Sequence, residues 1–324
     1  MKAIIQTGYG EPSDVLEIRE KERPFPKDNE VLIKIQAASI TFGDLAAVKG
    51  EPFIARLSLG LREPKIKTPG KDVAGIIEAV GHNVKEFKPG DKVFGDLSES
   101  GWGAYAEYVS APEGALVHMP DNISFDEAAA VPESGVVALQ GLRGKGQIKP
   151  GQKVLVYGAS GGIGTFAVQI AKSFDTEVTG VCSTRNLKLV NSLGADHVVD
   201  YTQEDFVESG ELYDLILATA GYRSIFDYKR ALKPDGRYVA TGGDMKQIFQ
   251  PMLLGPWVSN EGRKMTNLVM KPDKEDLPYL KELIETGKVS PVIDKSYPLN
   301  ELAQALQYYA EGRSRGKVVV TIAH

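Results

Sequence analysis

The sequence is poor in the residues that build disulfides and metal sites. Its 324 residues include a single cysteine, Cys182, and four histidines. One cysteine cannot form an internal disulfide, and it excludes every zinc site that needs two or more thiolates. The histidines lack the close spacing of metal ligands; they are His82, His118, His197 and His324. We therefore expect no structural or catalytic metal ion.

Dense positive charge and long apolar segments are also lacking. The formal net charge is −5, and no block of lysine and arginine supplies the basic face that nucleic-acid binding requires. Residues 154–171 carry no charge, but four glycines break them into two short periodic pieces, which does not fit a membrane span. The N-terminus reads as a strand and not as a secretory signal. We expect a cytoplasmic protein that has no membrane span and binds no nucleic acid.

Strand and turn patterns dominate the first third of the chain. Val31, Ile33 and Ile35 alternate with other side chains and predict one buried face of a strand. Further apolar runs at 72–80 and 92–94 end at glycines, as strands that lead into turns do. This part of the chain is therefore expected to be rich in β-structure.

Helix and strand patterns alternate from about residue 124 onward. Ser124 is followed by two acidic residues and an alanine run, which is typical of a helix start. The strands expected after it are 153–157, 177–182, 197–199, 212–219 and 237–241, and the helices are 161–174, 186–193 and 225–232. Such alternation predicts a parallel sheet with helices on both faces, for which we expect six strands.

The end of the chain is predicted to return to the first part. Beyond residue 271 come one more helix, an amphipathic segment at 299–309 and a strand at 318–322. We expect this strand to pair with the N-terminal β-structure. The predicted organisation is an α/β protein with a doubly wound parallel sheet in residues 123–270, flanked by a second domain made of 1–122 and 271–324.

A glycine-rich turn is the strongest functional signal. The strand Lys153–Tyr157 runs into Gly-Ala-Ser-Gly-Gly-Ile-Gly at 158–164 and then into an amphipathic helix. Glycines here allow a sharp turn, close approach of backbone N–H groups to a pyrophosphate, and tight packing of helix on strand. The anion would lie at the positive end of the helix dipole. This context predicts a dinucleotide site, whereas a tight turn without a ligand is the alternative.

The choice of cofactor can be read near the end of the next strand. An NAD site places an acid there to bind the ribose hydroxyls, yet no Asp or Glu lies between Glu177 and Asp196. The sequence offers Arg185 and Lys188 beside Ser183 instead, and such residues suit a 2′-phosphate. We therefore predict NADPH; the alternative is that both cations are merely solvated at a helix start.

Several motifs in a fixed order resemble a known family. They are "PGKDVAGIIEAVG" at 69–81, "KPGDKVFG" at 88–95, "GAYAEYV" at 103–109 and "LGADHVVDY" at 193–201. With the glycine turn, they resemble the quinone oxidoreductase branch of the medium-chain dehydrogenase/reductase superfamily. "GDLAAVKG" at 43–50 and "CSTRN" at 182–186 are similar to the group that contains chloroplast-envelope quinone oxidoreductase homologues and mitochondrial reticulon-interacting reductases.

This resemblance implies a fold and a set of cofactor contacts. It implies a GroES-like β-rich domain beside a Rossmann-type NADPH domain, with the active site in the interdomain cleft; a homodimer is common in the family. The implied cofactor residues are Ser160, Gly161, Gly162, Ile163 and Gly164 for the pyrophosphate; Ser183, Arg185, Lys188 and Tyr201 for the 2′-phosphate; Thr219, Ala220, Gly221, Thr241, Gly242 and Gly243 for the nicotinamide half; and Arg315 and Lys317 near the chain end. The chain departs from the family at 134–138, where the usual threonine is missing.

The residues implied at the reaction centre are polar and apolar but not metal-binding. Zinc-dependent members carry Cys and His where this chain has Thr41 and Lys71, so the resemblance implies a zinc-independent enzyme. Thr41 is the leading catalytic candidate, and Asp44 either assists it or makes a structural hydrogen bond. The candidate walls of the substrate pocket are Phe42, Phe53 and Trp102, for which core packing is the alternative. No general acid can be identified from the sequence.

These expectations converge on reduction of a polarised acceptor. Without a Lewis acid, charge that develops on a substrate oxygen needs hydrogen-bond donors, which suits quinones and α,β-unsaturated carbonyl compounds. The predicted function is therefore NADPH-dependent hydride transfer to such acceptors. Two alternatives stay open: a zinc-free reductase of saturated aldehydes and ketones, and a nucleotide-binding structural or regulatory protein with little turnover.

Overall fold

The computed structural model, of which we describe residues 1–323, divides into two compact units. Unit 1 consists of Met1–Glu133 and the chain from Pro291 onward, and unit 2 consists of Ser134–Ser290. The sequence places these boundaries at 122/123 and 270/271 instead. They differ because helix α4 (Phe125–Ala129) packs on the sheet of unit 1, whereas helix α10 (Asp276–Glu285) is bonded to unit 2. His324 lies outside the described residues.

Unit 1 is built on a seven-stranded sheet. The strand order is β14-β15-β3-β4-β5-β7, and β6 pairs with β3 beside this path. The strands are β3 (Glu30–Ser39), β4 (Asp72–Val80), β5 (Lys92–Asp96), β6 (Tyr108–Pro112), β7 (Leu116–His118), β14 (Ile293–Pro298) and β15 (Lys317–Thr321). A separate antiparallel pair is formed by β1 (Lys2–Gln6) and β2 (Leu16–Glu20).

The pattern in the sequence accounts for the core of this sheet. Val31, Ile33 and Ile35 of β3 are fully buried, as their alternation predicts. The terminal strand β15 pairs antiparallel with β3, with Val319 opposite Ser39. The predicted return of the chain end to the N-terminal β-structure is therefore confirmed.

Short helices surround the sheet of unit 1. They are α1 (Pro12–Val15), α2 (Phe42–Lys49), α3 (Arg56–Leu59), α4 and α11 (Leu302–Ala310), with 3₁₀ turns η1 (Phe53–Ala55), η2 (Glu113–Ala115) and η5 (Leu299–Glu301). The predicted helix start at Ser124 is confirmed, because the Ser124 hydroxyl accepts from the Glu127 N–H in a reciprocal capping box. No helix within residues 1–323 is long and apolar enough to cross a membrane.

Unit 2 contains the predicted six-stranded parallel sheet. The strand order is β10-β9-β8-β11-β12-β13, and every neighbouring pair is parallel. The strands are β8 (Lys153–Tyr157), β9 (Glu177–Cys182), β10 (His197–Asp200), β11 (Tyr213–Ala218), β12 (Leu232–Ala240) and β13 (Lys264–Asn267). The chain order reverses between β8 and β11, and ligands of doubly wound folds bind at such a reversal.

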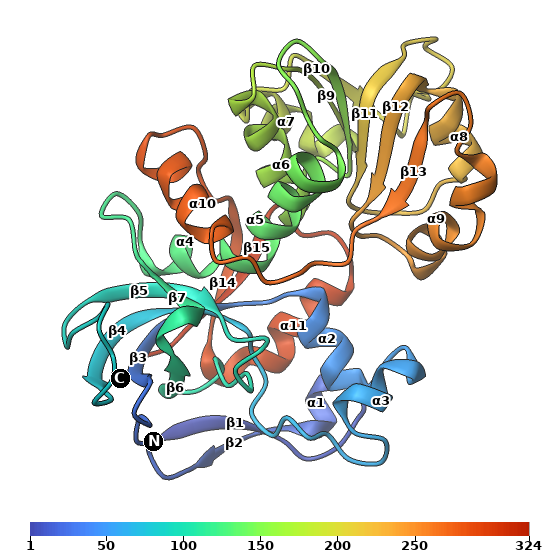
Figure 1. The fold of residues 1–324 in the computed structure, drawn as a ribbon. Coiled ribbons are helices and arrows are strands. Elements are labelled where there is room, and N and C mark those ends of the chain that lie inside the picture. Colours follow the sequence, from blue (N-terminus) through green and yellow to red (C-terminus); the bar gives the residue numbers. More distant parts are fainter. Residues whose placement is uncertain (324) are drawn as a thin grey trace. The chain divides into compact units, whose positions relative to one another are not determined.

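Helices cover both faces of this sheet, as the alternation predicts. Figure 1 shows α6 and α7 on one face and α8 and α9 on the other. The helices and turns between residues 132 and 285 are α5 (Pro132–Leu139), the π-helical turn η3 (Gln140–Lys145), α6 (Gly162–Ser173), η4 (Thr184–Asn186), α7 (Leu187–Ser192), α8 (Ile225–Arg230), α9 (Met245–Val258) and α10.

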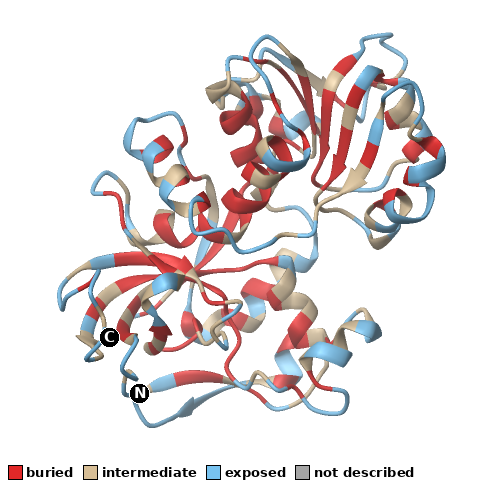
Figure 2. Ribbon diagram, viewed as in Figure 1, coloured by how far each residue is buried: buried red, intermediate tan, exposed pale blue. Residues whose placement is uncertain are grey.

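The cores of the two units are separate clusters of buried side chains. Figure 2 shows burial along the central strands of each sheet and exposure at the loops. In unit 2, Tyr228 and Tyr238 stack with ring centroids 4.5 Å apart, and both are buried. The central strand β8 buries Val154, Leu155 and Val156, as expected for a parallel strand covered on both faces.

Candidate functional site

The glycine turn connects β8 to α6 in the way that a phosphate cradle requires. Gly158 has φ 86°, a conformation that side chains disfavour. A Cβ at Gly164 would lie 2.1 Å from the Gly158 carbonyl oxygen, so only glycine lets the helix approach the strand this closely. Gly161 is the N-cap of α6, and the N–H groups of the first helical turn have no intrahelical acceptor. The turn formed by residues 160–164 can therefore bind an anion.

Asn186 supports this turn from the neighbouring loop. Its side-chain amide donates to Ser160 Oγ at 2.8 Å, and the residue is buried. The amide oxygen Oδ1 has no hydrogen-bond partner among residues 1–323. The sequence analysis missed this residue, because an asparagine just before a helix reads as an ordinary cap.

The residues predicted for a 2′-phosphate lie at adjacent strand ends. Ser183 follows β9, and Arg185 and Lys188 lie exposed in the first turns after it. Tyr201 follows β10, and its N–H donates to the Cys182 carbonyl at 3.1 Å, which places it beside the end of β9. The Tyr201 ring is half-exposed. The structure thus gathers these four predicted residues at one edge of the sheet.

One acidic residue also lies at this edge. Asp200 is the register partner of Cys182, so it reaches the end of β9 from the neighbouring strand. Hydrogen bonds from Thr184 and Thr202 lower the pKa of its carboxyl group. Those bonds measure 2.5 Å from Thr184 Oγ1 and 2.7 Å from Thr202 Oγ1. The sequence of β9 and α7 does not indicate Asp200, because only strand pairing brings it here.

The loops after β11 and β12 meet at the point where the strand order reverses. Thr219 Oγ1 donates to the Tyr157 carbonyl at 3.0 Å, and Thr241 Oγ1 donates to the Ala218 carbonyl at 3.3 Å. Both predicted hydroxyls are therefore engaged with backbone. Gly221 and Gly243 have φ 68° and 99°, and the two loops approach so closely that a Cβ at Gly243 would meet the Gly221 carbonyl.

A buried glutamine from α9 ties these two loops together. Gln247 Nε2 donates to the Ala220 carbonyl at 3.1 Å and to the Gly242 carbonyl at 2.9 Å. Its Oε1 accepts from the Tyr228 hydroxyl at 2.8 Å. Sequence analysis did not identify Gln247, because α9 itself was not predicted.

The predicted catalytic pair lies at the start of α2 in unit 1. Thr41 is the N-cap, and its Oγ1 donates to Asp44 Oδ2 at 2.8 Å. The Thr41 N–H donates to the same oxygen, while the Asp44 N–H donates back to Oγ1. Both residues are buried. The arrangement is a capping box, so Asp44 does make the structural hydrogen bonds that were its alternative role.

Asp44 nevertheless has the electrostatics of a functional group. Burial raises the pKa of Asp44 to about 6; the nearby Lys71 ammonium opposes this rise and Glu133 adds to it. Asp44 Oδ1 is buried without a hydrogen-bond partner in the described chain. A carboxyl group with such a pKa can hold or release a proton near neutral pH.

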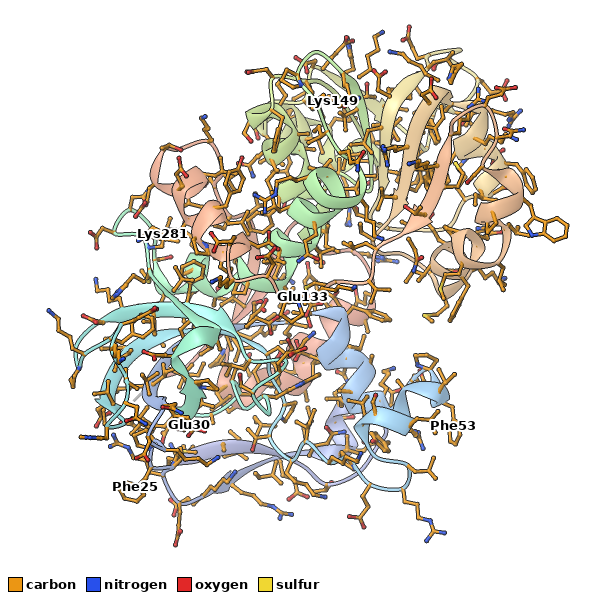
Figure 3. The ribbon with its side chains drawn as sticks, in the orientation of Figure 1. Phe25, Glu30, Phe53, Glu133, Lys149 and Lys281 are labelled. Atoms are coloured by element: carbon orange, nitrogen blue, oxygen red, sulfur yellow. The ribbon has the colours of Figure 1, made fainter. Side chains whose placement is uncertain are left out.

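The three aromatic residues proposed as pocket walls differ in exposure and surroundings. Trp102 is half-buried, and its ring centroid lies 5.3 Å from Lys71 Nζ. Phe42 opens α2 beside Thr41 and is 51% exposed. Phe53 is 67% exposed beside α3, well away from Glu133 in Figure 3. None of the three is core, so the core-packing alternative does not hold for them.

The two basic residues near the chain end belong to unit 1. Arg315 is exposed in the loop before β15. Lys317 is buried, with Nζ 3.6 Å from Asp72 Oδ2 and a hydrogen bond to the Ile40 carbonyl at 3.2 Å. The cofactor contact predicted for Lys317 stays a prediction, but its ammonium has partners within unit 1.

Metal ligands are not gathered anywhere in the described chain. No group of three or more His, Cys, Asp or Glu side chains that could hold a metal ion occurs in residues 1–323. The single cysteine, Cys182, is buried, and burial raises the pKa of its thiol to about 11.

Comparison with known proteins supports the organisation of the chain. The family described as alcohol dehydrogenase GroES-like domain matches residues 27–121, and the family described as zinc-binding dehydrogenase matches residues 193–320. The chain is 34% identical to the chloroplast envelope quinone oxidoreductase homolog of Arabidopsis thaliana, over 99% of this chain and 98% of that protein. It is 33% identical to the NADPH-dependent alkenal/one oxidoreductase of the same plant, over 99% of this chain and 79% of that protein.

A solved structure shows the same fold. The quinone oxidoreductase from Coxiella burnetii superimposes with a TM-score of 0.88 at 29% identity, covering 100% of this chain and 99% of that one. Because curated relatives above 30% identity span nearly the whole chain, the family is established. The cofactor of this family is a nicotinamide dinucleotide, NAD(P). The protein is an oxidoreductase and belongs to the medium-chain dehydrogenase/reductase superfamily, in the branch of the quinone oxidoreductases.

Proposed function

We propose that this oxidoreductase transfers hydride from NADPH to quinones or α,β-unsaturated carbonyl compounds without a zinc ion. The observation that carries the proposal is that unit 1 buries Thr41 and Lys71, at positions where the family resemblance places the metal ligands of zinc-dependent members. A hydroxyl and an ammonium donate hydrogen bonds but do not ligate zinc. Acceptors whose reduced form is a stabilised anion suit such donors.

The names of the relatives point to the same acceptors. One relative is named a quinone oxidoreductase homolog and another an NADPH-dependent alkenal/one oxidoreductase. An alkenal or alkenone is an unsaturated carbonyl compound, and a quinone is a doubly conjugated one. We extend both acceptor classes to this chain.

The preference for NADPH is supported by the cations at the ends of β9 and β10. Arg185 and Lys188 are exposed there beside Ser183 and Tyr201. Guanidinium binds a phosphate through paired, charge-assisted hydrogen bonds. Asp200, an acid at this edge, already accepts hydrogen bonds from two threonines. The residues present therefore fit a 2′-phosphate better than free ribose hydroxyls.

Within unit 1, Thr41 and Asp44 can deliver the proton that the reduction requires. NADPH supplies the hydride when it is bound. Asp44, with a pKa of about 6, holds a proton in part of the population near neutral pH. That proton can pass to Thr41 Oγ1, which lies 2.8 Å from Asp44 Oδ2. The Thr41 hydroxyl can then donate its own proton to a substrate oxygen. This relay fills the role of general acid that the sequence left unassigned.

An acceptor screen tests the function. Oxidation of NADPH would be followed with a quinone, an enone, the saturated ketone of the same carbon skeleton, and an aldehyde. We expect turnover with the quinone and the enone and none with the saturated ketone. Equal rates on the enone and the saturated ketone would favour a general carbonyl reductase. Tight NADPH binding without turnover of any acceptor would indicate a structural or regulatory protein.

Substitution of Arg185 tests the cofactor preference. Arg185→Ala should weaken NADPH binding by about ten- to a hundredfold, because a charge-assisted hydrogen bond contributes roughly 1.5–3 kcal/mol. NADH lacks the phosphate, so its Kd should stay nearly unchanged. Arg230→Ala, which removes an exposed arginine from α8, serves as the matched control. Equal losses for both cofactors, or a tighter Kd for NADH in the wild type, would refute the assignment.

A further inference from the structure

Unit 1 contains a cluster of ionisable side chains whose burial is costly. Asp44 and Asp72 are fully buried, Lys317 and Lys71 are 3% and 7% exposed, and the Glu133 side chain is 18% exposed. Removing charges from water costs several kcal/mol for each ion, and attraction between the ions seldom offsets more than this cost. Buried charge clusters of this kind are therefore candidates for functional sites.

One half of this cluster is closed. Lys317 pairs with Asp72, whose Oδ2 also accepts from Ser39 Oγ at 2.8 Å. The other oxygen of Asp72 accepts from the Glu133 N–H at 3.1 Å. Each carboxylate oxygen of Asp72 is thus engaged, and this half holds β3, β4 and β15 together.

The other half is open at Lys71. Its ammonium forms an ion pair with Glu133, which is its only hydrogen bond within residues 1–323. The ammonium lies 5.3 Å from the Trp102 ring centroid, in cation–π range. An ammonium carries three N–H donors, so two of them lack an acceptor in the described chain. A buried donor without an acceptor costs about 1–3 kcal/mol, which a ligand oxygen would recover.

The ammonium lies directly beside the catalytic pair. A Cβ at Gly43 would be 2.4 Å from Lys71 Nζ and 3.6 Å from Thr41 Oγ1. The missing side chain at Gly43 therefore makes the room in which the ammonium and the hydroxyl approach the same point. A carbonyl oxygen has two lone pairs and can accept from both donors at once.

We propose that Lys71 is a catalytic residue whose ammonium binds the carbonyl oxygen of the acceptor and stabilises the oxyanion formed during reduction, with Glu133 as its positioning residue. This inference rests on the proposed function and names the group that replaces a Lewis acid in it. Trp102, which has φ 66°, presents its ring to the same ammonium and provides a flat wall for a conjugated acceptor.

The electron and proton balance assigns each group one task. As the hydride is added to the β-carbon of an enone, a C–H bond forms and the C=C electron pair shifts to give an enolate. NADPH is oxidised and the acceptor is reduced. The Lys71 ammonium keeps its proton and offsets the charge on the enolate oxygen. The Thr41–Asp44 relay protonates that oxygen, and the enol returns to the ketone with solvent.

The charge state of Lys71 fits this task. Burial alone would lower the pKa of Lys71, but the carboxylates of Glu133 and Asp44 raise it above its ordinary value. The side chain therefore stays an ammonium across the working pH range. A permanent cation stabilises an oxyanion well and is a poor proton donor, so the proton must come from elsewhere.

Turnover of an enone by four variants tests the proposal. Lys71→Met should lower kcat about 100-fold or more, as loss of one oxyanion donor does in other enzymes, and leave the Kd for NADPH within about twofold. Lys71→Arg should have a kcat at least about tenfold higher than that of Lys71→Met. Because Lys71→Met leaves Glu133 unpaired and could impair folding, the double variant Lys71→Met/Glu133→Gln is measured beside it and should show the same loss. Lys49→Met, which removes a surface ion pair from α2, is the control and should match the wild type.

Binding of 4-nitrophenol tests the oxyanion site without turnover. This phenol titrates near neutral pH, and its yellow anion resembles the enolate or hydroquinone anion in charge and shape. On the wild type, its apparent pKa should fall by at least about one unit, because an adjacent cation favours the anion. Lys71→Met should abolish this shift. Glu133→Gln should keep part of it and move the alkaline limb of the rate profile to lower pH, which a purely structural role would not do.

The outcomes separate the two proposals. A folded Lys71→Met variant with kcat within threefold of the wild type, or with an unchanged phenolate shift, would overturn the role of Lys71. A Lys71-dependent shift without turnover of any acceptor would uphold the oxyanion site and refute the proposed function.

Discussion

Replacement of Gln247 by leucine should loosen the loops of unit 2 that are predicted to face the nicotinamide half of the cofactor. The side chain is fully buried and makes three hydrogen bonds, two to the carbonyls of Ala220 and Gly242 and one from the Tyr228 hydroxyl. Leucine fills a similar volume but satisfies none of these groups. Each buried polar group left without a partner costs about 1–3 kcal/mol, so we expect a loss of roughly 3–5 kcal/mol of unfolding free energy.

Two measurements check this prediction. Urea unfolding gives the change in stability, and a titration gives the Kd for NADPH, which should rise about tenfold because the loops after β11 and β12 are no longer held together. Gln203→Leu, at an exposed glutamine of the same unit, should change stability by less than about 0.5 kcal/mol. If Gln247→Leu unfolds at the same urea concentration as the wild type and binds NADPH equally well, the hydrogen bonds of Gln247 do not hold the loops.

Three further expectations concern the turn, the buried acid and metal dependence. Gly164→Ala should abolish cofactor binding, because its Cβ would lie 2.1 Å from the Gly158 carbonyl oxygen. Gly161→Ala should leave stability unchanged, because its Cβ would lie 3.6 Å from the nearest atom. Calorimetry distinguishes the two variants. The folded-state pKa of Asp44 is about 6 and its unfolded value about 3.9, so the native state holds this proton more tightly, and raising the pH from 4 to 6 should cost roughly 2 kcal/mol of stability. Asp44→Asn should flatten that slope in urea unfolding measured at both pH values; an unchanged slope would rule out Asp44 as its source. A chelator should leave turnover unchanged, and one tightly bound zinc per chain whose removal stops turnover would refute the proposed mechanism.

The sequence predicted the elements whose signals are local. Strand β8, the glycine turn and α6 follow one another directly, so periodicity and glycine placement located these elements correctly. Helix α9 was missed because Pro251 and Pro256 lie inside it and read as helix breakers. The sixth strand, β13, was expected but not located, since it is only four residues long.

Residues that act through tertiary contacts left no signal in the sequence. Lys71 was noted only as the loss of a histidine, and its pairing with Glu133 joins residues 62 positions apart. Asp200 reaches the end of β9 only through strand pairing, and Lys317 meets Asp72 only because β15 returns to β3. The patterns in the sequence locate elements, whereas these partners depend on how the elements are assembled.

The position of β15 determines the order in which the chain can fold during synthesis. This strand lies between β14 and β3, in the interior of the unit 1 sheet, although it is made last. Unit 2 is one uninterrupted stretch, so its sheet can form as soon as residue 290 has left the ribosome. Until then, β3 exposes the edge that β15 will cover, and the buried partner of Asp72 has not been made. A nascent chain stalled after unit 2 should therefore present a protease-resistant sheet beside an N-terminal segment that is readily cleaved and prone to aggregate.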